Sequence, residues 1–208
     1  MLANLKGIER KMSIRQRVQS RPELVRNTLI FLTEDEVKFA NLIGSKRNSS
    51  SRKLNTPDNR YKKTDPIEID QLGARAEMAI YKFCNQYPED MFMFKPKSKA
   101  NKTDLGDIVI EGFSVDVKAT KYKTGKLLAN IGPLPDIDIF GLIVENNLNE
   151  YDIKGFLPAY ELHDEKRIEI VGRRVYAAHQ KDLLDFDDAV KKYISHTKKG
   201  VDKIKVVK

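Results

Sequence analysis

The feature that most constrains this chain is the stretch from Thr103 to Thr120, which predicts a tight β-hairpin. Ile108 to Ile110 favour a strand, Glu111-Gly112 is a turn signal, and Phe113 to Thr120 alternates apolar with polar residues. Because side chains alternate between the two faces of a strand, one face here is apolar and the other carries a carboxylate beside an ammonium. The hairpin therefore needs a core on one side and can present charged groups on the other.

The charged face predicts a site for phosphodiester hydrolysis. Asp116 and Lys118 lie on it two residues apart, and Asp107 stands at the start of the preceding strand, within reach of the same edge. Carboxylates hold Mg²⁺ or Mn²⁺, which binds a substrate phosphate and lowers the pKa of a bound water. A nearby lysine can stabilise the negative charge that develops during attack. The alternative is an ordinary edge hairpin with an exposed Asp–Lys pair.

The spacing of Asp107 and the triplet Asp116-Val117-Lys118 resembles the PD-(D/E)xK nuclease superfamily, in which an acidic residue precedes (D/E)-x-K on the next strand. Gly106 stands where the pattern has proline, which many members also lack. The resemblance implies a restriction-endonuclease-like α/β core, with a mixed central β-sheet flanked by helices, that cleaves DNA with Mg²⁺ or Mn²⁺. It implies metal binding by Asp107, Asp116 and the Val117 carbonyl, and a catalytic role for Lys118.

A helix predicted from Asp65 to Tyr87 adds one more acidic candidate. Its apolar residues recur at spacings of three and four, which predicts a buried stripe of Leu72, Ala76, Ala79, Ile80 and Phe83. Glu77 lies at the margin of this stripe. In many superfamily members a helix before the core strands supplies a further metal-binding glutamate, and the resemblance gives Glu77 that catalytic, metal-binding role. The alternative is a solvent-facing glutamate.

Other apolar segments predict the rest of the core. These are a first strand at Met91 to Phe94, a buried strand at Ile137 to Val144, its neighbour at Tyr151 to Leu157, a helical turn at Pro158 to Leu162, a hairpin of Ile168 to Val171 with Arg174 to Ala177, and a final helix within Lys181 to Ile194.

Charge divides the chain into three parts. Residues 1–63 carry a net charge of +9, residues 64–190 carry −7 and residues 191–208 carry +6, which together give the net +8. In the first part, Pro22 predicts the start of a helix through Leu29, and Thr33 to Glu36 form a capping box for the next helix. We therefore expect a basic helical N-terminal region at 1–63, a nuclease core at 64–194 and a lysine-rich tail at 195–208.

Basic side chains near the hairpin and in the N-terminal region are candidates for phosphate contacts, and one tyrosine is a candidate for stacking on a base. The nucleic-acid-binding candidates are Lys46, Arg47, Arg52, Lys53, Lys97, Lys99, Lys121 and Tyr122. The alternative is that terminal basic runs are solvated and bind nothing.

Other features of the composition exclude several classes of protein. No apolar run approaches the roughly 18 residues of a membrane span, and the single Cys84 permits neither an internal disulfide nor a Cys/His zinc site. A cytoplasmic location fits, in the host cytoplasm if the chain is phage-encoded, because the layout resembles small phage-type members.

We expect a DNA endonuclease, with a homodimer left open. The alternatives are an RNA endonuclease or junction resolvase on the same fold, or a non-catalytic DNA-binding protein.

Overall fold

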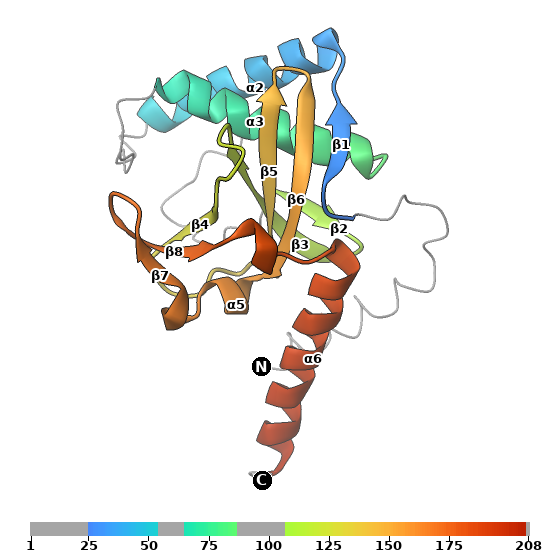
Figure 1. Ribbon diagram of the computed structural model, residues 1–208, viewed down its shortest axis with the longest axis vertical. Coiled ribbons are helices and arrows are strands. Elements are labelled where there is room, and N and C mark those ends of the chain that lie inside the picture. Colours follow the sequence, from blue (N-terminus) through green and yellow to red (C-terminus); the bar gives the residue numbers. More distant parts are fainter. Residues whose placement is uncertain (1–24, 54–64, 87–106, 207–208) are drawn as a thin grey trace.

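The computed structural model describes residues 25–53, 65–86 and 107–206, with side chains described at 25–49, 65–86 and 107–197. The protein is α/β, with two N-terminal helices, a curled five-stranded mixed sheet, a small antiparallel sheet and a C-terminal helix (Figure 1). The elements in chain order are β1 (Thr28–Phe31), α2 (Glu34–Lys53), α3 (Pro66–Phe83), β2 (Ile108–Ile110), β3 (Phe113–Thr120), β4 (Leu127–Asn130), β5 (Ile139–Asn147), β6 (Glu150–Pro158), α5 (Ala159–Leu162), η2 (Glu165–Arg167), β7 (Ile168–Ile170), β8 (Arg174–Ala178), η3 (Gln180–Asp182) and α6 (Phe186–Val206).

The large sheet has the strand order β1-β6-β5-β3-β2. β3 and β5 are parallel neighbours, and the other pairs are antiparallel, so the predicted mixed sheet is confirmed. β5 lies at its centre, where both faces are covered, and its residues are buried from Ile139 to Glu145. This burial explains why the sequence there is an unbroken apolar run and does not alternate.

Different layers cover the two faces of the large sheet. Helices α2 and α3 lie side by side across one end of it, and α6 leaves the body of the molecule at the other end (Figure 1). One core cluster joins these helices to the sheet, including Val37, Ile80, Val115 and Phe186. A second cluster joins the sheet to the small sheet β4-β8-β7. Of the described helices, none has the length and apolar character needed to span a membrane.

The N-terminal part of the fold differs from the prediction in one element. The sequence predicts a helix from Pro22 through Leu29, but Thr28–Phe31 forms β1, which pairs with β6. Asn27 precedes it with φ of 60°, a left-handed conformation that breaks a helix. The capping box is confirmed, because the Glu36 carboxylate accepts from the Thr33 N–H at 2.7 Å and the Thr33 hydroxyl accepts from the Glu36 N–H at 3.2 Å. Residues 25–53 thus contribute a strand and a packed helix to the fold.

The C-terminal part also differs from the prediction. The last helix begins at Phe186, because Leu184 is extended and bridges to Phe156 of β6, and it continues through the lysine-rich tail to Val206. Leu127–Asn130 forms β4, which the sequence analysis missed because four residues give too short a pattern. The predicted strands near β5 and β6, the turn at α5 and the β7–β8 hairpin are confirmed. The predicted strand Met91 to Phe94 lies outside the described residues.

Helices α2 and α3 approach each other closely at Gly44. A Cβ atom added there would lie 2.5 Å from the Cα of Gln71 and 2.6 Å from the carbonyl oxygen of Asp70, so only glycine fits. A Cβ added at Gly73 of α3 would meet nothing within 4 Å. Both glycines are helical, but only Gly73 has space for a side chain.

This contrast yields a matched pair of substitutions. We expect Gly44→Ala to lower the free energy of unfolding by about 1–3 kcal/mol, because backbone atoms cannot move aside for the new methyl group. We expect Gly73→Ala to raise it by up to about 1 kcal/mol, because alanine favours a helix. Urea unfolding of both variants measures the difference. A Gly44→Ala protein that is at least as stable as the unaltered protein would contradict the described close approach of α2 and α3.

Candidate active site

The predicted hairpin is present, and its short first strand pairs with only the first residues of β3. β2 and β3 are antiparallel, with Ile108 opposite Val115 and Ile110 opposite Phe113, and the turn has Glu111 at φ 50° and Gly112 at φ 82°. Both turn residues are left-handed, as two-residue hairpin turns of this type require. Because β2 begins only at Ile108, the described residues place no strand beside β3 past Val115 on this edge.

Asp107 covers the start of this open edge of β3. Its backbone N–H donates to the Val115 carbonyl at 2.8 Å, and its carboxylate Oδ2 accepts from the Val117 N–H at 2.8 Å. Tyr81 of α3 donates its hydroxyl to the Asp107 carbonyl at 3.2 Å. The N–H and C=O of one strand residue point to the same side, so the Val117 carbonyl also points toward the open edge. The Asp107 carboxylate and that carbonyl are therefore neighbours.

Asp116 and Lys118 form a close ion pair on β3. The Lys118 Nζ lies 2.5 Å from Asp116 Oδ1, and Asp116 is buried. The same ammonium lies 5.7 Å from the ring centroid of Phe140, which is the residue beside Asp116 in the parallel pairing with β5. The aromatic ring and the carboxylate together hold the ammonium at this edge of the sheet.

Glu77 is buried and pairs with an arginine from the neighbouring helix. Its exposed fraction is 5%, which removes the alternative of a solvent-facing glutamate. Arg47 of α2 donates from both terminal nitrogens, at 2.5 Å to Oε1 and 2.7 Å to Oε2. The sequence predicts that Arg47 grips phosphate, but here its planar fork is engaged by a carboxylate that fits it equally well. In this conformation Arg47 belongs to the site and not to a separate binding surface.

The three carboxylates influence one another. Burial, followed by the charges of Glu77 and Asp116, raises the pKa of Asp107 well above its usual value. Burial also raises the pKa of Glu77, and the Asp116 charge adds to this effect while Arg47 opposes it. With all side chains ionised, Glu77, Asp107 and Asp116 outweigh Arg47 and Lys118 by one negative charge. An additional cation would relieve this imbalance.

The chemistry of these donors fits a partly hydrated cation better than a closed metal cage. Across the described ranges, no three or more His, Cys, Asp and Glu side chains are grouped so as to hold a metal ion. Asp107, Asp116 and the Val117 carbonyl offer three oxygen donors from one edge, and Mg²⁺ commonly takes one or two carboxylates and keeps several waters. Arg47 donates to both oxygens of Glu77, which leaves one lone pair on each oxygen for a metal ion or for a water bound to it.

The remaining candidates for nucleic-acid contacts have different surroundings. Lys46 is exposed on α2. Lys121 bonds to Glu68 and lies 3.7 Å from Glu145, so two carboxylates balance its charge, and its phosphate contact stays a prediction. Tyr122 is 67% exposed. The side chains of Arg52 and Lys53, and all of Lys97 and Lys99, lie outside the described residues.

A buried network beside the site escaped the sequence analysis. Arg75 of α3 is 2% exposed and donates to Glu145 of β5 at 2.7 Å and to Asn41 of α2 at 2.6 Å. Tyr151 of β6 donates to the same Glu145 at 3.1 Å. The sequence does carry one signal for this network: Arg75 stands among the alanines of a buried helical stripe, where a charged side chain requires a partner. This network fixes α3 to the sheet and so positions Glu77.

The pair between Arg47 and Glu77 can be tested by its effect on stability. We expect Arg47→Met to lower the free energy of unfolding by about 3 kcal/mol, because it leaves a buried carboxylate without its partner. The double variant Arg47→Met/Glu77→Met should regain much of this loss, because an apolar pair needs no charge compensation. Lys38, which pairs with Glu34 and Asp35 on the exposed side of α2, is the control, and Lys38→Met should cost less than about 1 kcal/mol. Urea unfolding measures these three variants and the single variant Glu77→Met, and additive effects of Arg47→Met and Glu77→Met in the double variant would show that the pair is not coupled.

No family model, no curated protein and no solved structure matches this chain. The chemistry of the residues at the open edge of β3 is therefore what bears on its function.

Proposed function

We propose that this chain is a metal-dependent nuclease that hydrolyses phosphodiester bonds in DNA, with a PD-(D/E)xK-type site on a restriction-endonuclease-like core. The observation that carries the proposal is the meeting of Asp107 with Val117 and of Asp116 with Lys118 at one open strand edge. The contacts are 2.8 Å from the Val117 N–H to Asp107 Oδ2 and 2.5 Å from Lys118 Nζ to Asp116 Oδ1. Oxygen donors and a fixed ammonium at one strand edge suit metal-dependent phosphodiester hydrolysis.

Each residue has a distinct role in the proposed site. Asp107, Asp116 and the Val117 carbonyl hold Mg²⁺ or Mn²⁺. The bound ion supplies a water of lowered pKa and neutralises charge on the scissile phosphate. Lys118 stabilises the negative charge that grows on the phosphate oxygens, and Asp116 keeps the ammonium in place at 2.5 Å. Glu77, paired with Arg47, supplies a buried negative charge behind the carboxylates.

Charge balance supports a phosphodiester substrate. When all five charged groups of the site are ionised they sum to one negative charge, and a divalent cation changes this sum to one positive charge. A phosphodiester carries one negative charge, so its arrival brings the sum to zero. A neutral sum matters here because uncompensated charge is costly where the dielectric is low.

The DNA substrate is proposed from the basic parts of the chain, whose phosphate contacts would weaken with salt. RNA cleavage and junction resolution remain alternative activities of the same site. A non-catalytic DNA-binding protein is a different alternative, in which the pairs Asp116–Lys118 and Glu77–Arg47 serve only stability. Incubation of supercoiled plasmid with the protein in Mg²⁺ tests the proposal directly, because only a DNA endonuclease converts it to nicked or linear forms.

Replacing each aspartate with asparagine, which has nearly the same shape, tests the proposed metal-binding role of the two carboxylates. We expect Asp107→Asn and Asp116→Asn to lose at least about 10²-fold in cleavage rate, since removal of one preorganised group typically has that effect. In Asp107→Asn the side-chain amide oxygen can still accept from the Val117 N–H, so the fold should remain. Plasmid nicking in Mg²⁺, with EDTA as control and circular dichroism for folding, checks this. Normal nicking by either variant, or in excess EDTA, would exclude the proposed roles.

The role of Lys118 is tested by comparing rate with stability. We expect Lys118→Ala to retain DNA binding while its single-turnover rate falls by about 10²–10³-fold, because the ammonium acts on charge that develops during attack. Lys118→Arg should restore little of the single-turnover rate, because a planar guanidinium does not replace a compact ammonium. If Lys118 is only a partner of Asp116, the variant will instead melt at a lower temperature and cleave normally per folded molecule. Both quantities are measured on one preparation.

A further inference from the structure

The turn that follows β3 carries an exposed aromatic ring on a tightly closed backbone. Tyr122 is 67% exposed and lies four residues after Lys118. Its N–H donates to the Thr120 hydroxyl at 3.2 Å, and its carbonyl accepts from the Gly125 N–H at 2.8 Å. The backbone of Tyr122 is thus held on both sides while its ring faces solvent.

Two further contacts fix this turn in place. A Cβ atom added at Gly125 would lie 2.6 Å from Thr120 Cγ2 and 2.9 Å from the Tyr122 carbonyl oxygen, so the turn closes too tightly for another residue. Gln180 of η3 donates its side-chain amide to the carbonyls of Lys123 at 2.8 Å and Gly125 at 2.9 Å. The turn is therefore tied both to the end of β3 and to the segment after β8. An aromatic ring presented on such a turn loses little freedom when it binds.

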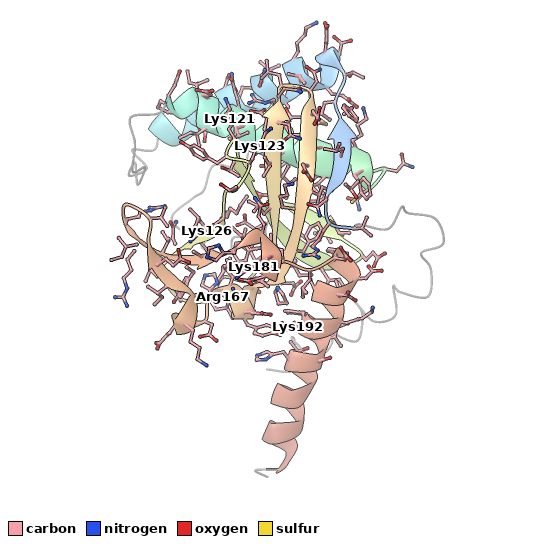
Figure 2. All side chains as sticks on the ribbon, viewed as in Figure 1. Lys121, Lys123, Lys126, Arg167, Lys181 and Lys192 are labelled. Carbon is pink, nitrogen blue, oxygen red and sulfur yellow. The ribbon has the colours of Figure 1, made fainter. Side chains whose placement is uncertain are left out.

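Basic side chains lie on this turn and beyond it. Figure 2 shows Lys121, Lys123, Lys126, Lys181, Arg167 and Lys192 spread from the end near α3 to α6. Four of these are balanced by acids: Lys121 by Glu68, Lys126 by Glu169, and Arg167 and Lys192 by Glu161. Lys123 and Lys181 are exposed, and neither forms an ion pair with any residue that the structure describes. Their charges can therefore bind an external anion.

We propose that Tyr122 stacks on an unpaired base while Lys123 and Lys181 contact phosphates of the same strand, so that this surface binds single-stranded nucleic acid. An exposed ring fits an unpaired base because every base has a π-face, and free ammonium groups fit the backbone. Paired bases of an intact duplex do not offer that face. The inference rests on the proposed nuclease function for its biological meaning, since it assigns to that site a substrate with a single-stranded segment.

Binding measured without cleavage tests this surface by itself. Fluorescence anisotropy in EDTA follows a labelled oligothymidine and a labelled duplex of equal length. We expect Tyr122→Ala to weaken oligothymidine binding by about 10-fold, with a much smaller effect on the duplex. Tyr122→Phe should bind as the unaltered protein does, because the ring and not the hydroxyl makes the contact. Phe31→Ala is the matched control, since Phe31 is 59% exposed on β1 at the opposite edge of the sheet.

The lysines are tested through salt dependence. Each phosphate contact to a single strand contributes a slope of about −0.7 to the logarithm of affinity against the logarithm of salt concentration. Lys123→Ala/Lys181→Ala should therefore flatten the slope for oligothymidine by about 1.4. Tyr122→Ala should leave the slope unchanged, because the ring carries no charge. An unchanged slope in the double lysine variant would overturn the phosphate contacts.

The outcomes separate this inference from the proposed function. Unaltered oligothymidine binding by Tyr122→Ala, or an equal loss for oligothymidine and duplex, would overturn the stacking role even if the protein cleaves DNA in Mg²⁺. Tyr122-dependent binding by a protein that fails to cleave DNA would support this surface and overturn only the nuclease proposal. Melting temperatures of each variant confirm that the compared proteins are folded.

Discussion

The early end of the β2–β3 pairing is the constraint on which the site depends. β2 covers β3 only as far as Val115, so no strand among the described residues offers the Val117 N–H a main-chain acceptor. Buried or partly buried backbone N–H groups need an acceptor, and the Asp107 carboxylate supplies it at 2.8 Å. This single bond places a carboxylate against the strand that carries Asp116 and Lys118. A longer β2 would replace the carboxylate with a main-chain carbonyl and close the edge.

The helices contribute to the same edge through close packing and buried charge. Gly44 lets α2 approach α3, and three residues later on α2 Arg47 meets Glu77 of α3. Arg75, two residues before Glu77, is bonded to Glu145 of the central strand, so α3 cannot rotate without breaking a buried ion pair. Stability and site geometry therefore depend on the same contacts. Burial raises the pKa of Asp107 and of Glu77, and the nearby negative charge of Asp116 adds to both effects.

The elements with local sequence patterns were predictable from the sequence. The β2–β3 hairpin, the capping box before α2, the start of α3 next to Asp65 and the strands β5 and β6 were predictable, because turn residues, caps and hydrophobic periods act over a few neighbouring residues. β1 was not, because its strand conformation comes from pairing with β6, more than a hundred residues away. The length of α6 and the existence of β4 were also missed, since a lysine-rich tail and four residues carry weak patterns.

The sequence alone identifies the side chains that share the charged face of β3, because alternation along a strand is dictated by backbone geometry. It also placed Asp107 near that face, since a two-residue turn returns the chain alongside itself. Only the tertiary structure decided the partner of each charge: Arg47 binds Glu77, Lys121 binds Glu68, and Lys123 and Lys181 form no ion pair with a described residue. An ion pair joins groups that are remote in sequence, and their distance is set by how helices and sheets pack, which no local pattern encodes.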